Sequence, residues 1–166
     1  SPYDARFAAM AFSLDRDVQY RRLILPFLAG RPGRWVVQDR GVLSSLAYQP
    51  LQSECERDAH PVTLEWLLSL EGNRLAVEHA PDAFIFIDVD PDIAQGRLEG
   101  RADKIDGDRY DRADFQTALA ARFRDPATCA PLTERGTRVV VLDGSKTKDG
   151  LAADMHAFLD GLVPTR

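Results

Sequence analysis

The sequence predicts an α/β fold built on a parallel sheet. Three short runs are apolar on consecutive residues, as is typical of strands that are buried on both faces: 35–37, 83–89 and 139–142. Between these runs, apolar residues recur at helical spacing, and alternation of buried strand with helix favours parallel pairing. The length of 166 residues suits one domain, so we expect a single domain over residues 1–166.

Composition excludes several classes of protein. The 26 acidic and 21 basic residues give a net charge of −5, the wrong sign for a domain whose main partner is nucleic acid. No apolar run approaches the ~18 residues of a membrane-spanning helix, and the first residues lack the pattern of a secretion signal. Cys55 and Cys129 stand outside any metal-binding spacing. We therefore expect a reduced, cytoplasmic protein with neither a membrane nor a nucleic-acid partner and no protein-built metal site.

The helices can be placed in chain order. Ser1 and Pro2 are suited to an N-cap and a first helical position, and Phe7, Met10 and Leu14 continue at helical steps. Gly30, with Pro32 and Gly33 after it, ends that pattern. We expect helices over 1–28, 42–49, 61–79, from 90–92 onward, 114–123 and 149–162, with strands at 35–39, 83–89 and 139–142.

Each predicted strand ends in acidic or polar residues. Asp39 and Arg40 follow the first strand, Asp88 ends the second, and Asp143 follows the third. Because ligands of open α/β sheets bind outside the carboxyl ends of the strands, we expect the site at this edge.

The segment from Asp39 to Gln49 is the most informative. It has the pattern Asp-Arg-x3-Ser-x2-Ala-Tyr-Gln after a predicted strand. On composition alone, a surface ion pair followed by an ordinary amphipathic helix would explain it equally well. The pattern resembles the signature of thymidylate kinases, in which Asp-Arg-aromatic-x2-Ser-x2-Ala-Tyr-Gln follows a strand.

Other segments agree with this resemblance in order and spacing, over essentially the whole chain. Phe12-x2-Asp15-Arg16 resembles the helix in which the family's phenylalanine stacks on thymine and its arginine reaches the base. The segment 81–91 resembles its Pro-Asp-strand-Asp-Val-x-Pro step, and 97–112 resembles its basic lid. The resemblance implies a three-layer, P-loop nucleoside monophosphate kinase fold that transfers the γ-phosphoryl of ATP to dTMP with Mg²⁺. It also implies a homodimer packed through helices such as 61–79.

The residue types suit a nucleoside monophosphate on physical grounds as well. Such a ligand offers a flat base, a sugar and a dianion, which call for an aromatic face, hydrogen-bonding groups and a fixed guanidinium. Phe12 can supply the face, Arg16 lies one turn later on the same side of a helix, and the planar fork of Arg40 suits phosphate oxygens. Core packing is the alternative for Phe12, and a solvated pair with Asp15 or Asp17 is the alternative for Arg16.

The resemblance implies roles for further residues. Ser44, Ser45, Tyr48 and Gln49 would contact the sugar and base, while Asp39 would lie near the metal or the acceptor. Arg101 and Arg109 would act from the lid, where cations neutralise a transferring phosphoryl group after closure. A solvated loop whose acids offset its basic residues is the alternative for 97–112.

The sequence departs from the family at two points. It contains no G-x4-G-K-[ST] loop for the ATP phosphates, and Gly144 to Thr147, the nearest imitation, lacks the leading glycine. Gly41 stands where the family has an aromatic or histidine residue, which weakens the wall near the monophosphate. We expect the family's first strand, which lies between those resembling 35–39 and 84–89, and its P-loop to precede Ser1. We also expect the 166-residue chain alone to be inactive.

Two other functions stay open at this point. One is a non-catalytic nucleotide-binding or dimerisation module that has lost the ATP-binding loop. The other is a nucleoside or nucleotide kinase of the same superfamily with another base, against which the Ser-x2-Ala-Tyr-Gln run argues.

Overall fold

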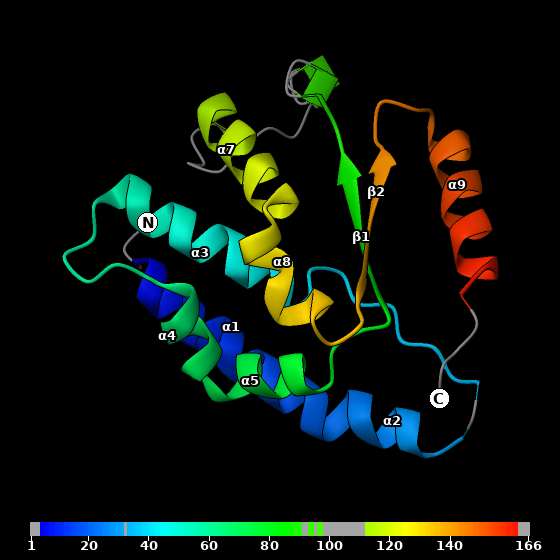
Figure 1. Ribbon diagram of the computed structural model, residues 1–166, viewed down its shortest axis with the longest axis horizontal. Helices are drawn as coiled ribbons and strands as arrows, with labels where there is room; N and C mark the ends of the chain where they lie inside the picture. Colours follow the sequence, from blue (N-terminus) through cyan, green and yellow to red (C-terminus); the bar gives the residue numbers. More distant parts are fainter. Residues whose placement is uncertain (1–3, 32, 91–92, 95, 98–111, 163–166) are drawn as a thin grey trace.

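A pair of parallel strands and two groups of helices make up the fold. The computed structural model describes residues 4–31, 33–90, 93–94, 96–97 and 112–162. Strand β1 (Ala83–Asp88) pairs in parallel with β2 (Arg138–Asp143), from Ala83 opposite Arg138 to Asp88 opposite Asp143. Helix α9 (Lys148–Asp160) flanks one side of this pair, and α7 (Ala113–Arg124) and α8 (Pro126–Thr133) flank the other (Figure 1). The predicted parallel sheet is confirmed for these two strands.

The remaining helices form a layer beyond the ends at which β1 and β2 begin (Figure 1). In this layer α1 (Ala5–Gln19) packs against α3 (Val42–Glu56) and α5 (Glu71–Glu78), and α4 (Leu64–Ser69) precedes α5. Leu43, Leu46, Leu67 and Leu132 are fully buried in one hydrophobic cluster, against which Phe84 and Phe86 of β1 and Val139 of β2 pack. The Phe123 ring of α7 stacks on Phe84 and Phe86 of β1, which packs α7 against the sheet.

The predicted strand at 35–39 is wrong. Residues 34–38 have no regular secondary structure, and the Val37 side chain is 87% exposed. A strand needs a neighbour to pair its backbone N–H and C=O groups. The described residues supply no such neighbour for 34–38, so these residues cross the surface as an irregular segment.

The first helical segment differs in detail from its prediction. The expected cap at Ser1 lies outside the described residues, and α1 begins at Ala5 with Asp4 as N-cap, whose carboxylate accepts from Phe7 N at 2.7 Å. A π-helical turn, η1 (Tyr20–Ile24), joins α1 to α2 (Leu25–Ala29). This turn precedes Pro26, which has no N–H to donate within a helix.

The buried face of α1 is not its most apolar one. Ala5, Ala9, Ser13 and Arg16 are buried, whereas the stripe that predicts the helix is exposed: Phe7, Met10, Leu14. The small residues let the neighbouring helices approach the α1 backbone closely.

Three other helical predictions can be compared with the structure. The predicted helix 61–79 forms two helices, α4 and α5, because Leu70 has an extended conformation between them. Helices α7 and α9 confirm the predictions at 114–123 and 149–162, while α8 is not anticipated. The helix start expected at 90–92 lies mostly outside the described residues. Within the described ranges, no helix combines the length and apolar character that crossing a bilayer requires.

Candidate functional site

Arg16 is a buried cation at the junction of three helices. Its side chain on α1 donates from Nη2 to Ser45 Oγ of α3 at 2.9 Å and from Nη1 to Asn73 Oδ1 of α5. Burial lowers the pKa of the guanidinium from its ordinary value, because the charged form loses hydration. The alternative of a solvated pair with Asp15 or Asp17 is therefore wrong.

Phe12 lies one helical turn before Arg16 and is 52% exposed. Residues four apart on a helix share a side, so the ring lies next to the buried face of α1 without entering the core. Core packing does not explain Phe12, and its ring is accessible to a flat ligand.

The second cation, Arg40, lies two residues before the start of α3. The Arg40 guanidinium carbon lies 5.2 Å from the centre of the Tyr48 ring, and Arg40 itself has a left-handed backbone with φ of 57°. Among the described residues no carboxylate forms an ion pair with Arg40, so the simple Asp39–Arg40 surface pair is not formed. Asp39 and Arg40 are both exposed.

The four polar residues of α3 that the sequence assigns to the site differ in how deeply they are buried. Ser45 and Gln49 are buried one turn apart, while Ser44 and Tyr48 are half-buried. The Gln49 Oε1 atom has no hydrogen-bond partner in the described part of the molecule. A buried carbonyl oxygen without a donor is costly, so this atom is suited to receive a donor from a ligand or water.

Helix α3 relates the two cations. Arg16 contacts Ser45, Tyr48 follows three residues later on α3, and the Tyr48 ring lies under Arg40. The Tyr48 ring also packs against Phe115 and Phe123 of α7. The structure thus places Phe12 and Arg16 on one side of α1, and Ser45 and Tyr48 on adjacent turns of α3.

The carboxyl ends of β1 and β2, where the sequence predicts the site, point away from the layer that contains α1 and α5 (Figure 1). Asp88 pairs with Arg124, and Asp143 accepts from the Ser145 hydroxyl at 2.6 Å and backbone N–H at 2.9 Å, which lowers the pKa of Asp143. The Arg97 Nη1 atom donates to the Gly144 carbonyl oxygen at 2.8 Å. Arg101 and Arg109, and most of the predicted lid, lie outside the described residues.

Asn73 was missed by the sequence interpretation. It is completely buried and contacts Arg16, but it comes from a helix 57 positions further along the chain. The only feature of the local sequence that could have indicated Asn73 is that it is a polar residue next to Gly72 in the first turn of a helix. In the described residues, His, Cys, Asp and Glu side chains form no group of three or more placed to hold a metal ion.

Comparisons with known proteins agree on one family. A family profile described as thymidylate kinase matches residues 1–152. A probable thymidylate kinase of Staphylothermus marinus is 36% identical over 156 residues, which cover 94% of this chain and 67% of the relative. A probable thymidylate kinase of Thermococcus onnurineus is 37% identical over 92% of this chain and 63% of its own length. The thymidylate kinase of Dinoroseobacter shibae is 33% identical over 90% of this chain and 65% of its own length.

The chain thus spans roughly two thirds of the length of these relatives. No solved structure matches it significantly.

Proposed function

The chain belongs to the thymidylate kinase family, with its α/β P-loop nucleoside monophosphate kinase fold, and on this basis we propose that it forms the dTMP-binding part of an enzyme that phosphorylates dTMP to dTDP with ATP. The observation that carries the proposal is the buried hydrogen bond from Arg16 of α1 to Ser45 of α3, the helix whose Tyr48 lies under Arg40. With Phe12 one turn before Arg16, these residues supply the aromatic, donor and cationic groups that a pyrimidine monophosphate requires.

The base is assigned to the Phe12 and Arg16 end. The Phe12 ring would stack on thymine, and Arg16 would donate to a carbonyl oxygen of the base. Arginine has five N–H donors, and two of the nitrogen atoms of Arg16 each use one on Ser45 and Asn73. Donors therefore remain for a ligand, and a donor-only side chain selects a base that offers carbonyl oxygens.

The sugar and phosphate are assigned to the start of α3. Arg40 is exposed, permanently charged and planar, so it would bind two phosphate oxygens of dTMP at once. Tyr48, Ser44 and the orphan oxygen of Gln49 would contact the sugar and the base edge. Holding the acceptor phosphate in place supplies one part of phosphoryl transfer, which also requires a positioned donor and charge neutralisation.

The ATP side of the reaction is proposed from the family. Mg²⁺ accompanies ATP and neutralises charge on its phosphates, and it keeps several waters, so it needs only one or two protein carboxylates. Asp39, an exposed carboxylate beside Arg40, is compatible with that role. Arg101 and Arg109 are proposed to act from the lid. Because the sequence has no G-x4-G-K-[ST] loop, we propose that the 166-residue chain by itself binds dTMP without transferring phosphoryl.

A homodimer is also proposed. The exposed apolar residues Phe7, Met10, Leu14 and Val18 recur at three- and four-residue steps along one side of α1. A second copy of the chain would cover them, whereas the 61–79 segment, through which the resemblance implies dimer packing, forms α4 and α5, which already pack against α1 and α3 of the same chain. Sedimentation should give twice the chain mass, and Leu14→Glu should shift it to a single chain. A monomeric parent at micromolar concentration would contradict the dimer.

Thermal unfolding with added nucleotide tests the proposed function. A ligand that binds only the folded chain raises its stability by RT ln(1 + [L]/Kd), so dTMP should raise the midpoint and dCMP should raise it less. Equal shifts with dTMP and inorganic phosphate would show that the base is not recognised, and no shift would show that the site does not bind dTMP.

A further inference from the structure

Asn73 connects Arg16 to the end of a neighbouring helix. The Asn73 side chain is completely buried; its Oδ1 accepts from Arg16 Nη1, and its Nδ2 donates to the Leu67 carbonyl oxygen at 2.8 Å. Arginine only donates and a carbonyl only accepts, so the chemistry of the two partners fixes which way the amide faces. Leu67 lies in the last turn of α4, and its carbonyl oxygen also accepts from the N–H of Leu70, the C-cap of that helix, at 3.2 Å.

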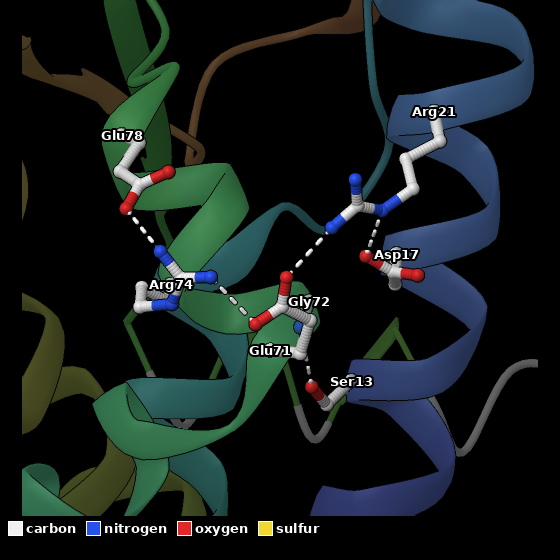
Figure 2. Close-up of polar contacts among 7 residues, drawn as sticks. All are labelled: Ser13, Asp17, Arg21, Glu71, Gly72, Arg74 and Glu78. Atoms are coloured by element: carbon white, nitrogen blue, oxygen red, sulfur yellow. Dashed lines mark hydrogen bonds and ion pairs between the residues drawn. The ribbon is translucent and has the colours of Figure 1, made fainter.

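Gly72 makes this placement possible. The first turn of α5 contacts the backbone of α1, and Gly72 N donates to Ser13 Oγ at 3.1 Å (Figure 2). Any side chain on residue 72 would collide with the Ser13 carbonyl. Arg16 lies one turn after Ser13 on α1, so the contact between Gly72 and Ser13 brings the next residue, Asn73, to Arg16.

The hydrogen-bond partners of Arg16 are polar but neutral. Ser45 and Asn73 are uncharged, and no carboxylate forms an ion pair with it within the described ranges. Tyr20 and Asp15 act on the Arg16 pKa in the opposite direction to burial, but burial is the larger effect. A buried charge without an ion-pair partner gains most from precisely oriented hydrogen bonds. The direction of the remaining N–H groups is therefore decided by the two neutral acceptors.

We propose that Asn73 is a positioning residue that holds the Arg16 guanidinium so that its remaining donors face a carbonyl oxygen of the bound base. Asn73 touches no ligand in this arrangement and acts through Arg16. The consequence is base selectivity: thymine presents a carbonyl where cytosine presents an amino group, and fixed N–H donors accept the first and reject the second. This inference rests on the proposed function, because it takes Arg16 to be a base contact.

Two replacements of similar size separate this role from a merely structural one. Asn73→Leu and Asn73→Asp both remove the donor to Leu67, but only Asn73→Asp keeps an acceptor for Arg16. Calorimetric affinities for dTMP and dCMP should show that Asn73→Leu loses at least about tenfold of the preference for dTMP. Asn73→Asp should keep that preference within about threefold of the parent. Equal behaviour of the two folded variants, both keeping or both losing the preference, would overturn the proposal.

A measurement on the parent chain keeps the test decisive if a variant does not fold. Nitrogen NMR of the unliganded chain, with the Arg16 signals assigned by their loss in Arg16→Lys, should show separate, slowly exchanging Nη1 and Nη2 groups. A single averaged signal would overturn the proposal, because the guanidinium would then rotate freely. If the parent shows these separate signals but binds no dTMP, the proposed function fails while the fixed Arg16 stands.

Discussion

The backbone of Gly72 lies directly against Ser13. A Cβ atom on Gly72 would lie 1.8 Å from the Ser13 carbonyl oxygen and 2.8 Å from Asp17 N. Helices α1 and α5 therefore cross in backbone contact, and the candidate site depends on this crossing because Arg16 and Asn73 meet beside it. Ion pairs from Arg21 to Asp17 and Glu71, at 2.7 and 2.6 Å, surround the crossing (Figure 2). Exposed pairs of this kind contribute little to stability, because solvent screens the two charges.

Gly72→Ala should destabilise the chain. Alanine is favoured over glycine in a helix by about 0.5–1 kcal/mol, but the added methyl group would meet backbone atoms that cannot move aside. Overpacking typically costs ~1–3 kcal/mol, so we expect a net loss in the free energy of unfolding, measured by urea denaturation. Gly161→Ala is the control, because its nearest non-neighbouring atom would be 3.5 Å from the new Cβ. A more stable Gly72→Ala variant would show that the helices do not touch here.

Arg40→Ala should weaken dTMP binding at least about tenfold, since hydrogen bonds to a charged group contribute ~1.5–3 kcal/mol. The control is Arg57→Ala. Both arginines are exposed, both have a left-handed backbone, and they lie at opposite ends of α3. Calorimetry should give parent affinity for Arg57→Ala only. Unchanged affinity in Arg40→Ala would remove Arg40 from the phosphate site.

Phe12→Ala should weaken dTMP binding by about 1 kcal/mol or more, roughly fivefold, because an aromatic stacking surface for the base is lost. Competition by inorganic phosphate should stay at the parent value, since phosphate does not use the ring. Phe27→Ala is the matched control: Phe27 is similarly exposed, at 45% compared with 52%, and lies on α2, away from the proposed site and from the proposed dimer face of α1. If the two variants bind dTMP equally well, Phe12 does not stack on the base.

The 166-residue chain should show no dTMP phosphorylation in a coupled assay of ADP release. The reason is the missing glycine-rich loop, whose backbone N–H groups would hold the ATP phosphates. Turnover clearly above a blank without protein would contradict this expectation, and would direct attention to Gly144 to Thr147 as a substitute loop.

Local signals predicted much of the fold, and contacts between distant segments explain what was missed. Helices α7 and α9 follow from residue spacing, and β1 and β2 follow from unbroken apolar runs. The run 35–37 looks equally strand-like, but a strand also requires a neighbour, which its own residues cannot reveal. Likewise, the Phe12–Arg16 spacing predicts a shared side of a helix, but the partner of Arg16 depends on how α5 crosses α1.

Calorimetric titration of the chain with dTMP, and with dCMP under the same conditions, tests the central claim most directly. The account predicts saturable binding of dTMP at one site per chain, with dCMP at least about tenfold weaker, because Arg16 offers donors only. A chain that unfolds cooperatively, and is therefore folded, yet binds neither nucleotide or binds both equally well, would contradict the assignment of Phe12, Arg16 and Arg40 to a thymidine monophosphate site.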